Sequence, residues 1–226
     1  MKLHLAECRT RCRRQLACAA ACVLALAGSV AATEIIDRVL AVVSGDVIML
    51  SDVNAARDLH LLNVEVGSDP VGEILPRLID RSLMLAEVER YAPPEPASDL
   101  VDRRMQTVQA TFPTTQSFET ALARVGFDAK HLRERLRQDL RILAYLDQRF
   151  TLPPLNDEDL ERYYREHPQG FTQDGRLTPF QQVRQMILEA ATAERRQRLV
   201  DEWVAGLRRR AEITQPIVSD VPSRVP

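Results

Sequence analysis

Two short runs of β-branched and other apolar residues open the folded part of the chain, at 35–43 and 47–50. A polar triplet containing Gly45 separates them, and glycine readily adopts the positive φ angles of tight turns. Two such runs around a short turn predict a β-hairpin. Ser51 and Asp52 follow, and we expect Ser51 to cap a helix whose dipole Asp52 complements.

Beyond this point apolar residues recur every three or four positions, which is the period of an α-helix with one buried face. Glycine and proline interrupt the pattern and divide it into separate helices. We expect residues 171–178 to form a loop and residues 213–218 to form a closing strand. The expected helices lie at 51–62, 71–91, 98–112, around 118–125, 128–150, 156–167 and 179–210.

Individual residues indicate where these helices begin and end. Thr114 or Thr115, and Asp128, have side-chain oxygens suited to N-caps. Gly126 suits the left-handed position that follows a helix. Pro76 is expected in the first turn of its helix, where a missing N–H is tolerated.

Two helices have apolar stripes that predict their buried faces. The stripe of the helix at 71–91 consists of Leu75, Leu78, Ile79, Ser82, Leu85 and Ala86, and Ile74, Leu83 and Met84 widen this face. The stripe of the helix at 128–150 consists of Leu132, Leu136, Leu140, Leu143 and Asp147. The sequence therefore predicts a mainly α fold with a short N-terminal β-hairpin and a long C-terminal helix.

The first 32 residues are set apart by composition. A basic stretch at 1–14 precedes an apolar run at 16–27 and the small residues 28–32, which is the pattern of a secretory signal peptide cleaved after Ala31 or Ala32. An uncleaved anchor is the alternative, although the segment is short and alanine-rich. A lipoprotein signal at Cys22 is a further alternative. The pattern predicts export to the periplasm without stable membrane insertion.

Cysteine and charge exclude several classes of protein. All four cysteines lie within the predicted leader, so the remaining chain has no disulfide framework and no thiolate site. Residues 33–226 carry a net charge of −6, because the leader contributes +4 to the total of −2. This balance argues against a nucleic-acid-binding protein.

Several segments resemble the SurA family of periplasmic chaperones. The opening hairpin with its Ser-Asp helix start is the most specific, together with the two C-terminal segments. The matching segments are residues 36–53, 74–88, 118–142, 157–168, 178–187 and 203–213. The resemblance implies a multi-helix SurA N-terminal-type domain in which the long C-terminal helix packs back on the earlier helices.

The resemblance also implies a division of the chain. Residues 156–215 would complete the core that residues 33–155 begin, and residues 216–226 would be a flexible tail. In the family, a prolyl isomerase domain of the parvulin type is inserted at the position that corresponds here to the segment between Phe171 and Thr178. Here only six residues separate these positions, too few for such a domain.

No motif for catalysis is present in the sequence. His60, His131 and His167 are too far apart in sequence to form a helical metal motif, and we interpret them as surface residues. We therefore expect no catalytic residue, cofactor or metal. Large or soft apolar residues suit adaptable binding surfaces, although each could equally belong to the core. The candidate peptide-binding residues are Met84, Met105, Phe112, Phe118, Phe127 and Met186.

The resemblance and the absence of motifs lead to one expected function. The chain is expected to act as an ATP-independent periplasmic chaperone for unfolded or partly folded envelope proteins, outer-membrane proteins above all, without isomerase activity. One alternative is an envelope scaffold or accessory protein that binds a single folded partner. The other is a divergent peptidyl-prolyl isomerase.

Overall fold

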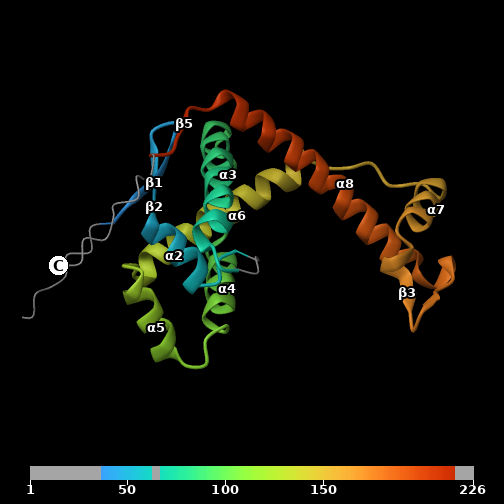
Figure 1. Cartoon of the computed structure of the whole chain (residues 1–226), viewed down its shortest axis with the longest axis horizontal. Helices are drawn as coiled ribbons and strands as arrows, with labels where there is room; N and C mark the ends of the chain where they lie inside the picture. The colour runs from blue at the N-terminus through green and yellow to red at the C-terminus, as the bar shows by residue number, and fades with distance from the viewer. Residues whose placement is uncertain (1–36, 63–66, 217–226) are drawn as a thin grey trace, which may run out of the picture. The chain divides into compact units, whose positions relative to one another are not determined.

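The computed structural model describes residues 37–62 and 67–216, which belong to one compact unit that begins at Asp37. These residues form seven α-helices, one 3₁₀ turn and two small antiparallel sheets (Figure 1). The mainly α fold predicted from the sequence is confirmed. The predicted leader, and the predicted tail from residue 217 onward, lie outside the described residues. None of the helices described has both the length and the apolar character needed to cross a membrane.

A three-stranded sheet joins the beginning of the described chain to its end. β1 (Val39–Val43) and β2 (Asp46–Met49) form the predicted hairpin, and β5 (Ile213–Thr214) pairs with the other edge of β1. Ser44 and Gly45 make the turn with φ angles of 50° and 98°. Two successive positive φ angles are typical of the tight turns that match the twist of a hairpin.

The start of α2 (Leu50–Asp58) differs from the prediction. Asp52, not Ser51, serves the helix start, because its carboxylate accepts a hydrogen bond of 2.8 Å from the Met49 amide. The amide and hydroxyl of Ser51 both donate to the carboxylate of Asp37. Ser51 therefore links the start of α2 to the segment that precedes β1, and it does not cap the helix.

α2 ends at Asp58, four residues before the predicted end. His60 lies just beyond it with a φ angle of 52°, in the left-handed region. A residue in this conformation cannot continue a right-handed helix. The final residues of the predicted helix therefore lie in a turn.

α3 (Pro70–Tyr91) is capped by Asp69, whose carboxylate accepts a 2.9 Å hydrogen bond from the Gly72 amide. Pro76 lies in the second turn, not the first as predicted, so the helix lacks one internal hydrogen bond there. The buried face contains Ile74, Leu78, Ile79 and Leu83 of the predicted face, and it also includes Glu87 and Val88, which were not predicted.

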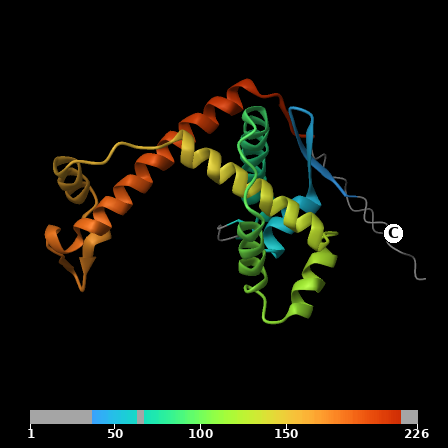
Figure 2. The same ribbon diagram turned by 180° about the vertical axis from the view of Figure 1, so that it is seen from behind.

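Three helices follow, joined by short turns: α4 (Ser98–Gln109), α5 (Thr115–Arg124) and α6 (Ala129–Arg149). Thr114 accepts from the Ser117 amide at 3.1 Å, which confirms one of the two predicted caps of α5. Asp128 caps α6 by accepting a 2.7 Å hydrogen bond from the amide three residues later. α6 packs beside both α3 and α4. Figure 2 shows the molecule from behind, and α6 faces the viewer there.

The C-terminal region begins with α7 (Asp157–Glu166) and a 3₁₀ turn, η1 (Pro168–Phe171). The predicted loop that follows is a small hairpin of β3 (Thr172–Gln173) and β4 (Arg176–Leu177). The predicted long helix is present as α8 (Phe180–Arg210). Its early turns pack against α7 and its late turns pack against α3, as expected of a C-terminal helix that returns to the first helices (Figure 1).

Buried side chains form four apolar clusters along this path. The first joins the hairpin, α2 and α3 with Leu207 of α8, and the second lies where α2, α4, α5 and α6 meet. The third lies between α7 and the first turns of α8, and the fourth between α3 and α6. Between Ala191 and Leu207, no described residue of α8 is fully buried, although Val200 and Trp203 pack against the fourth cluster from this stretch.

Candidate functional site

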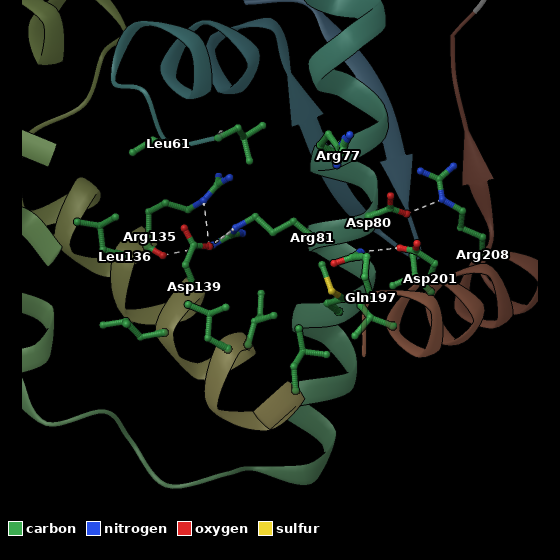
Figure 3. Close-up of a pocket in the computed structure, with 18 of the residues that line it drawn as sticks. Leu61, Arg77, Asp80, Arg81, Arg135, Leu136, Asp139, Gln197, Asp201 and Arg208 are labelled. Atoms are coloured by element: carbon green, nitrogen blue, oxygen red, sulfur yellow. Dashed lines mark hydrogen bonds and ion pairs between the residues drawn. The ribbon is translucent and has the colours of Figure 1, made fainter. Parts of the chain in front are cut away.

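A groove with a mainly apolar floor lies between α3, α6 and the second half of α8. Its volume is about 520 Å³, and Figure 3 shows the side chains that line it. Leu61 and Leu62, which follow α2, close one end. Its apolar residues are Leu61, Leu62, Met84, Leu136, Leu140, Ile142, Leu143, Leu146, Val200, Val204 and Ala205, and its polar residues are Arg77, Asp80, Arg81, Arg104, Arg135, Asp139, Gln197, Asp201 and Arg208.

The apolar floor comes mainly from α6. Its predicted stripe divides in two: Leu132 and Leu136 are buried in the second cluster, whereas Leu140 is only partly buried and Leu143 is 54% exposed. The leucines of α6 that the core does not fully cover therefore line the groove. Val204 of α8 is also only partly buried, and it lines the opposite wall. Apolar surface of this kind, open to water, is characteristic of interaction sites.

Two arginines share one carboxylate on the rim. Arg81 of α3 donates to Asp139 of α6 at 2.6 Å, and Arg135 Nε lies 3.6 Å from the same oxygen, beyond hydrogen-bonding distance (Figure 3). Both arginine side chains are 14% exposed. Within residues 37–62 and 67–216, Arg135 Nε is a buried donor without a hydrogen-bond partner.

Burial, together with the neighbouring charge of Arg81, lowers the pKa of Arg135 to about 10, against the opposing attraction of Asp139 and Asp52. The direction of this shift means that the surroundings disfavour the guanidinium charge. Arg135 nevertheless stays charged at neutral pH. It is therefore a cation that the protein itself neutralises incompletely.

The remaining rim charges also leave an excess of arginine. Asp80 pairs with Arg208, while Asp201 accepts a 2.8 Å hydrogen bond from Gln197. Arg77 and Arg104 are exposed and form no ion pair with any residue that the structure describes. With five arginines and three aspartates, the lining carries a net charge of +2.

A second hollow, of about 540 Å³, lies between α7 and α8. Its charges face one another: Arg162 pairs with Asp159, and the His167 ring lies 3.6 Å from Glu194. Its lining contains few large aliphatic side chains, so it offers less surface to an apolar ligand than the groove does.

The structure separates the six predicted peptide-binding residues into three places. Met84 is partly buried and lines the groove. Phe118 is buried in the second cluster, and its ring centroid lies 5.4 Å from that of Phe112. Met105 and Phe127 pack on the same cluster as these two. Met186 lies on the early turns of α8, 50% exposed and outside the groove.

The histidines lie apart from one another, as their spacing predicted. His60 packs edge-on against Phe112, His131 lies beside Asp128, and His167 stacks on Tyr163 at 4.1 Å. Across the described ranges, no three His, Cys, Asp or Glu side chains gather in a way that could hold a metal ion.

Of the six residues selected from the sequence, only Met84 lines the groove. Leu143 was expected to be buried, and the arginines resembled an ordinary solvated helix surface. The one available signal was the length of the leucine repeat in α6, which exceeds what one facing helix can cover.

Among solved structures, the chain is similar to one from work on the virulence factor PEB4 and the periplasmic protein Cj1289. These are described as two structurally related SurA-like chaperones of Campylobacter jejuni. The likeness covers 79% of this chain and 98% of the other, with a TM-score of 0.51 and 12% sequence identity. No protein-family model and no curated protein sequence matches the chain. The fold is SurA-like, as the resemblance in the sequence implied.

Proposed function

We propose that the protein is an ATP-independent chaperone that holds unfolded polypeptides in the groove between α3, α6 and α8. The observation that carries this proposal is the open apolar floor, in which Leu143 remains 54% exposed. Unfolded chains expose apolar side chains that folded proteins bury, so such a surface binds them in preference to native proteins. The SurA-like fold supports the same conclusion by analogy.

The proposed clients are unfolded or partly folded envelope proteins, above all outer-membrane proteins. This assignment follows from the predicted leader at 1–32 and from the resemblance to periplasmic chaperones. Binding to the unfolded state lowers its free concentration and thereby slows aggregation, with no bond made or broken. No nucleotide is required for this mass-action mechanism.

The test is the aggregation of an outer-membrane protein diluted from urea, followed by light scattering, with the exported protein in several-fold excess. We expect suppression by the wild type and weaker suppression by Leu143→Gln. Replacing one half-exposed leucine should remove about 1 kcal/mol of apolar contact, a loss of about fivefold in affinity.

Leu177→Gln provides a matched control. Leu177 is 48% exposed on β4 and does not line the groove, so this variant should protect the client as well as the wild type does. Equal loss in both variants would show that the groove is not the binding surface. Absence of suppression by the wild type, together with tight binding of a single folded protein, would favour a scaffold instead.

A further inference from the structure

The groove combines apolar surface with a positive charge that the protein only partly neutralises. Arg81 and Arg135 converge on Asp139, which is 29% exposed and forms a hydrogen bond with the first of them only. A second nitrogen of Arg81, Nη2, donates to the Gln138 side chain at 2.9 Å and to the Arg135 carbonyl at 3.4 Å. The buried Nε of Arg135 has no such partner among the residues described.

We infer that the groove selects unfolded segments in which apolar side chains lie next to a carboxylate, and that Arg135 is the residue that binds this carboxylate. The inference rests on the proposed function and specifies its substrate class. Asp139 forms its hydrogen bond with Arg81, and its negative charge is shared between Arg81 and Arg135. A carboxylate from the client would give the Arg135 guanidinium a hydrogen bond and a negative charge of its own. Guanidinium and carboxylate suit each other in geometry, since both are planar and can bond through two parallel contacts.

Charge complementarity supports an acidic occupant over a neutral or basic one. The lining carries +2, although residues 33–226 as a whole carry −6. The positive charge is thus concentrated at the groove against the sign of the rest of the chain. Arg77 and Arg104 stand on the exposed rim, where they attract acidic segments before the buried contact forms.

The apolar floor restricts which acidic ligands fit. Leu140, Leu143 and Val204 offer no hydrogen bonds, so a purely polar anion would lose its hydration without compensation. An extended peptide meets both demands, because apolar side chains can cover the floor while a neighbouring Asp or Glu reaches the rim. The occupant is therefore an acidic-apolar polypeptide segment.

The experiment compares three fluorescent peptides that share one apolar segment and differ only in two flanking residues. The flanks are aspartate, serine or lysine, and both peptide ends are blocked so that side chains carry the only charges. We expect the exported protein to bind the aspartate peptide about fivefold more tightly than the serine peptide, and the lysine peptide most weakly. The preference should shrink in high salt, because the rim is exposed.

Arg135→Met tests the assigned residue, since it removes the charge and retains an apolar side chain of similar length. It should abolish most of the preference for aspartate while leaving the serine peptide bound. The double variant Arg77→Gln/Arg104→Gln, at exposed positions, repeats the test without altering a buried site, and it should reduce the preference. Arg176→Gln on β4 is the control and should retain it.

The outcomes separate this inference from the function on which it rests. Equal binding of the three peptides would overturn the selectivity and leave the chaperone proposal intact. Failure to bind any of them would contradict both. Tighter binding of laurate, an apolar chain with a carboxylate, than of every peptide would assign the groove to a lipid and overturn the inference.

Discussion

Arg135 lies where its guanidinium is largely shielded from water, next to a second arginine and one shared carboxylate. Burying a charge costs free energy that only well-formed hydrogen bonds can offset. Arg135 Nε has no hydrogen bond among the described residues. A residue that destabilises its own fold is expected where binding requires it.

We therefore predict that Arg135→Met stabilises the protein, raising the free energy of unfolding by about 1 kcal/mol. The lowered pKa of Arg135 agrees with this direction, because it means that the folded state disfavours the protonated guanidinium. At neutral pH, which lies below this pKa, Arg135 is protonated and the full destabilisation is present. Urea denaturation followed by circular dichroism measures the change.

Arg133→Met on the same helix is the control. Arg133 is only partly covered and pairs with Asp102 near the surface, so its loss should leave the free energy of unfolding almost unchanged. Strong destabilisation by Arg135→Met would mean that this arginine holds α6 in place, and its role in binding would have to be reconsidered.

At the residue scale, the residues selected from the sequence and the residues that line the groove are mostly different. Met84 does line the groove, but Phe118 is buried, and neither Leu143 nor Arg135 was selected. Whether a leucine on an apolar stripe is covered depends on the placement of another helix far along the chain. Local periodicity contains no information about that placement.

At the element scale, local chemistry predicted most helix boundaries. Asp128 and Gly126 act at the ends for which they were proposed, because caps and left-handed positions depend on nearby backbone groups alone. Ser51 failed as a cap because Asp37, fourteen residues earlier, takes its hydrogen bonds. The 172–177 hairpin was missed because strands of two residues are too short to show alternation.

The turn between α5 and α6 supplies a test at this scale. Gly126 has a φ angle of +71°, and a Cβ atom added there would meet no atom within 4 Å. Gly126→Ala should therefore lower the free energy of unfolding by about 1 kcal/mol through backbone strain alone. Thermal or urea denaturation would detect this change.

Gly170→Ala is a matched control for that prediction. Its added Cβ would also meet nothing within 4 Å, but its φ angle lies outside the positive region. This variant should be neutral or slightly stabilising, because alanine restricts the unfolded chain more than glycine does. Similar losses in both variants would show that conformation at residue 126 is not the cause.

At the scale of the whole molecule, α8 explains why a groove exists. Its early turns pack with α7 and its last turns with α3, while the stretch between them contacts the fourth cluster only through Val200 and Trp203, which are partly buried. Arg196 of this stretch pairs with Asp147 at the end of α6. The helix is thus fixed at both ends, and its middle leaves the leucines of α6 partly uncovered.

The same architecture bears on prolyl isomerisation. In SurA-type proteins that carry an isomerase domain, the domain would stand between Phe171 and Thr178. Here the Thr178 amide donates to the Phe171 carbonyl at 2.9 Å, and the Tyr164 hydroxyl donates to the Thr178 carbonyl at 2.6 Å. These bonds close the base of the β3–β4 hairpin, so only η1 and this hairpin connect α7 to α8.

A refolding assay distinguishes holding from catalysis by the sign of its effect. For a client whose refolding is limited by proline isomerisation, an isomerase accelerates the slow phase when present in catalytic amounts. A protein that only binds the unfolded state leaves that phase unchanged in catalytic amounts and slows folding when in excess, by withdrawing the species that folds. We expect the second behaviour, with less slowing by Leu143→Gln than by the wild type. Acceleration at one molecule of this protein per hundred of client would contradict the non-catalytic mechanism, because mass action at that ratio cannot change the observed rate.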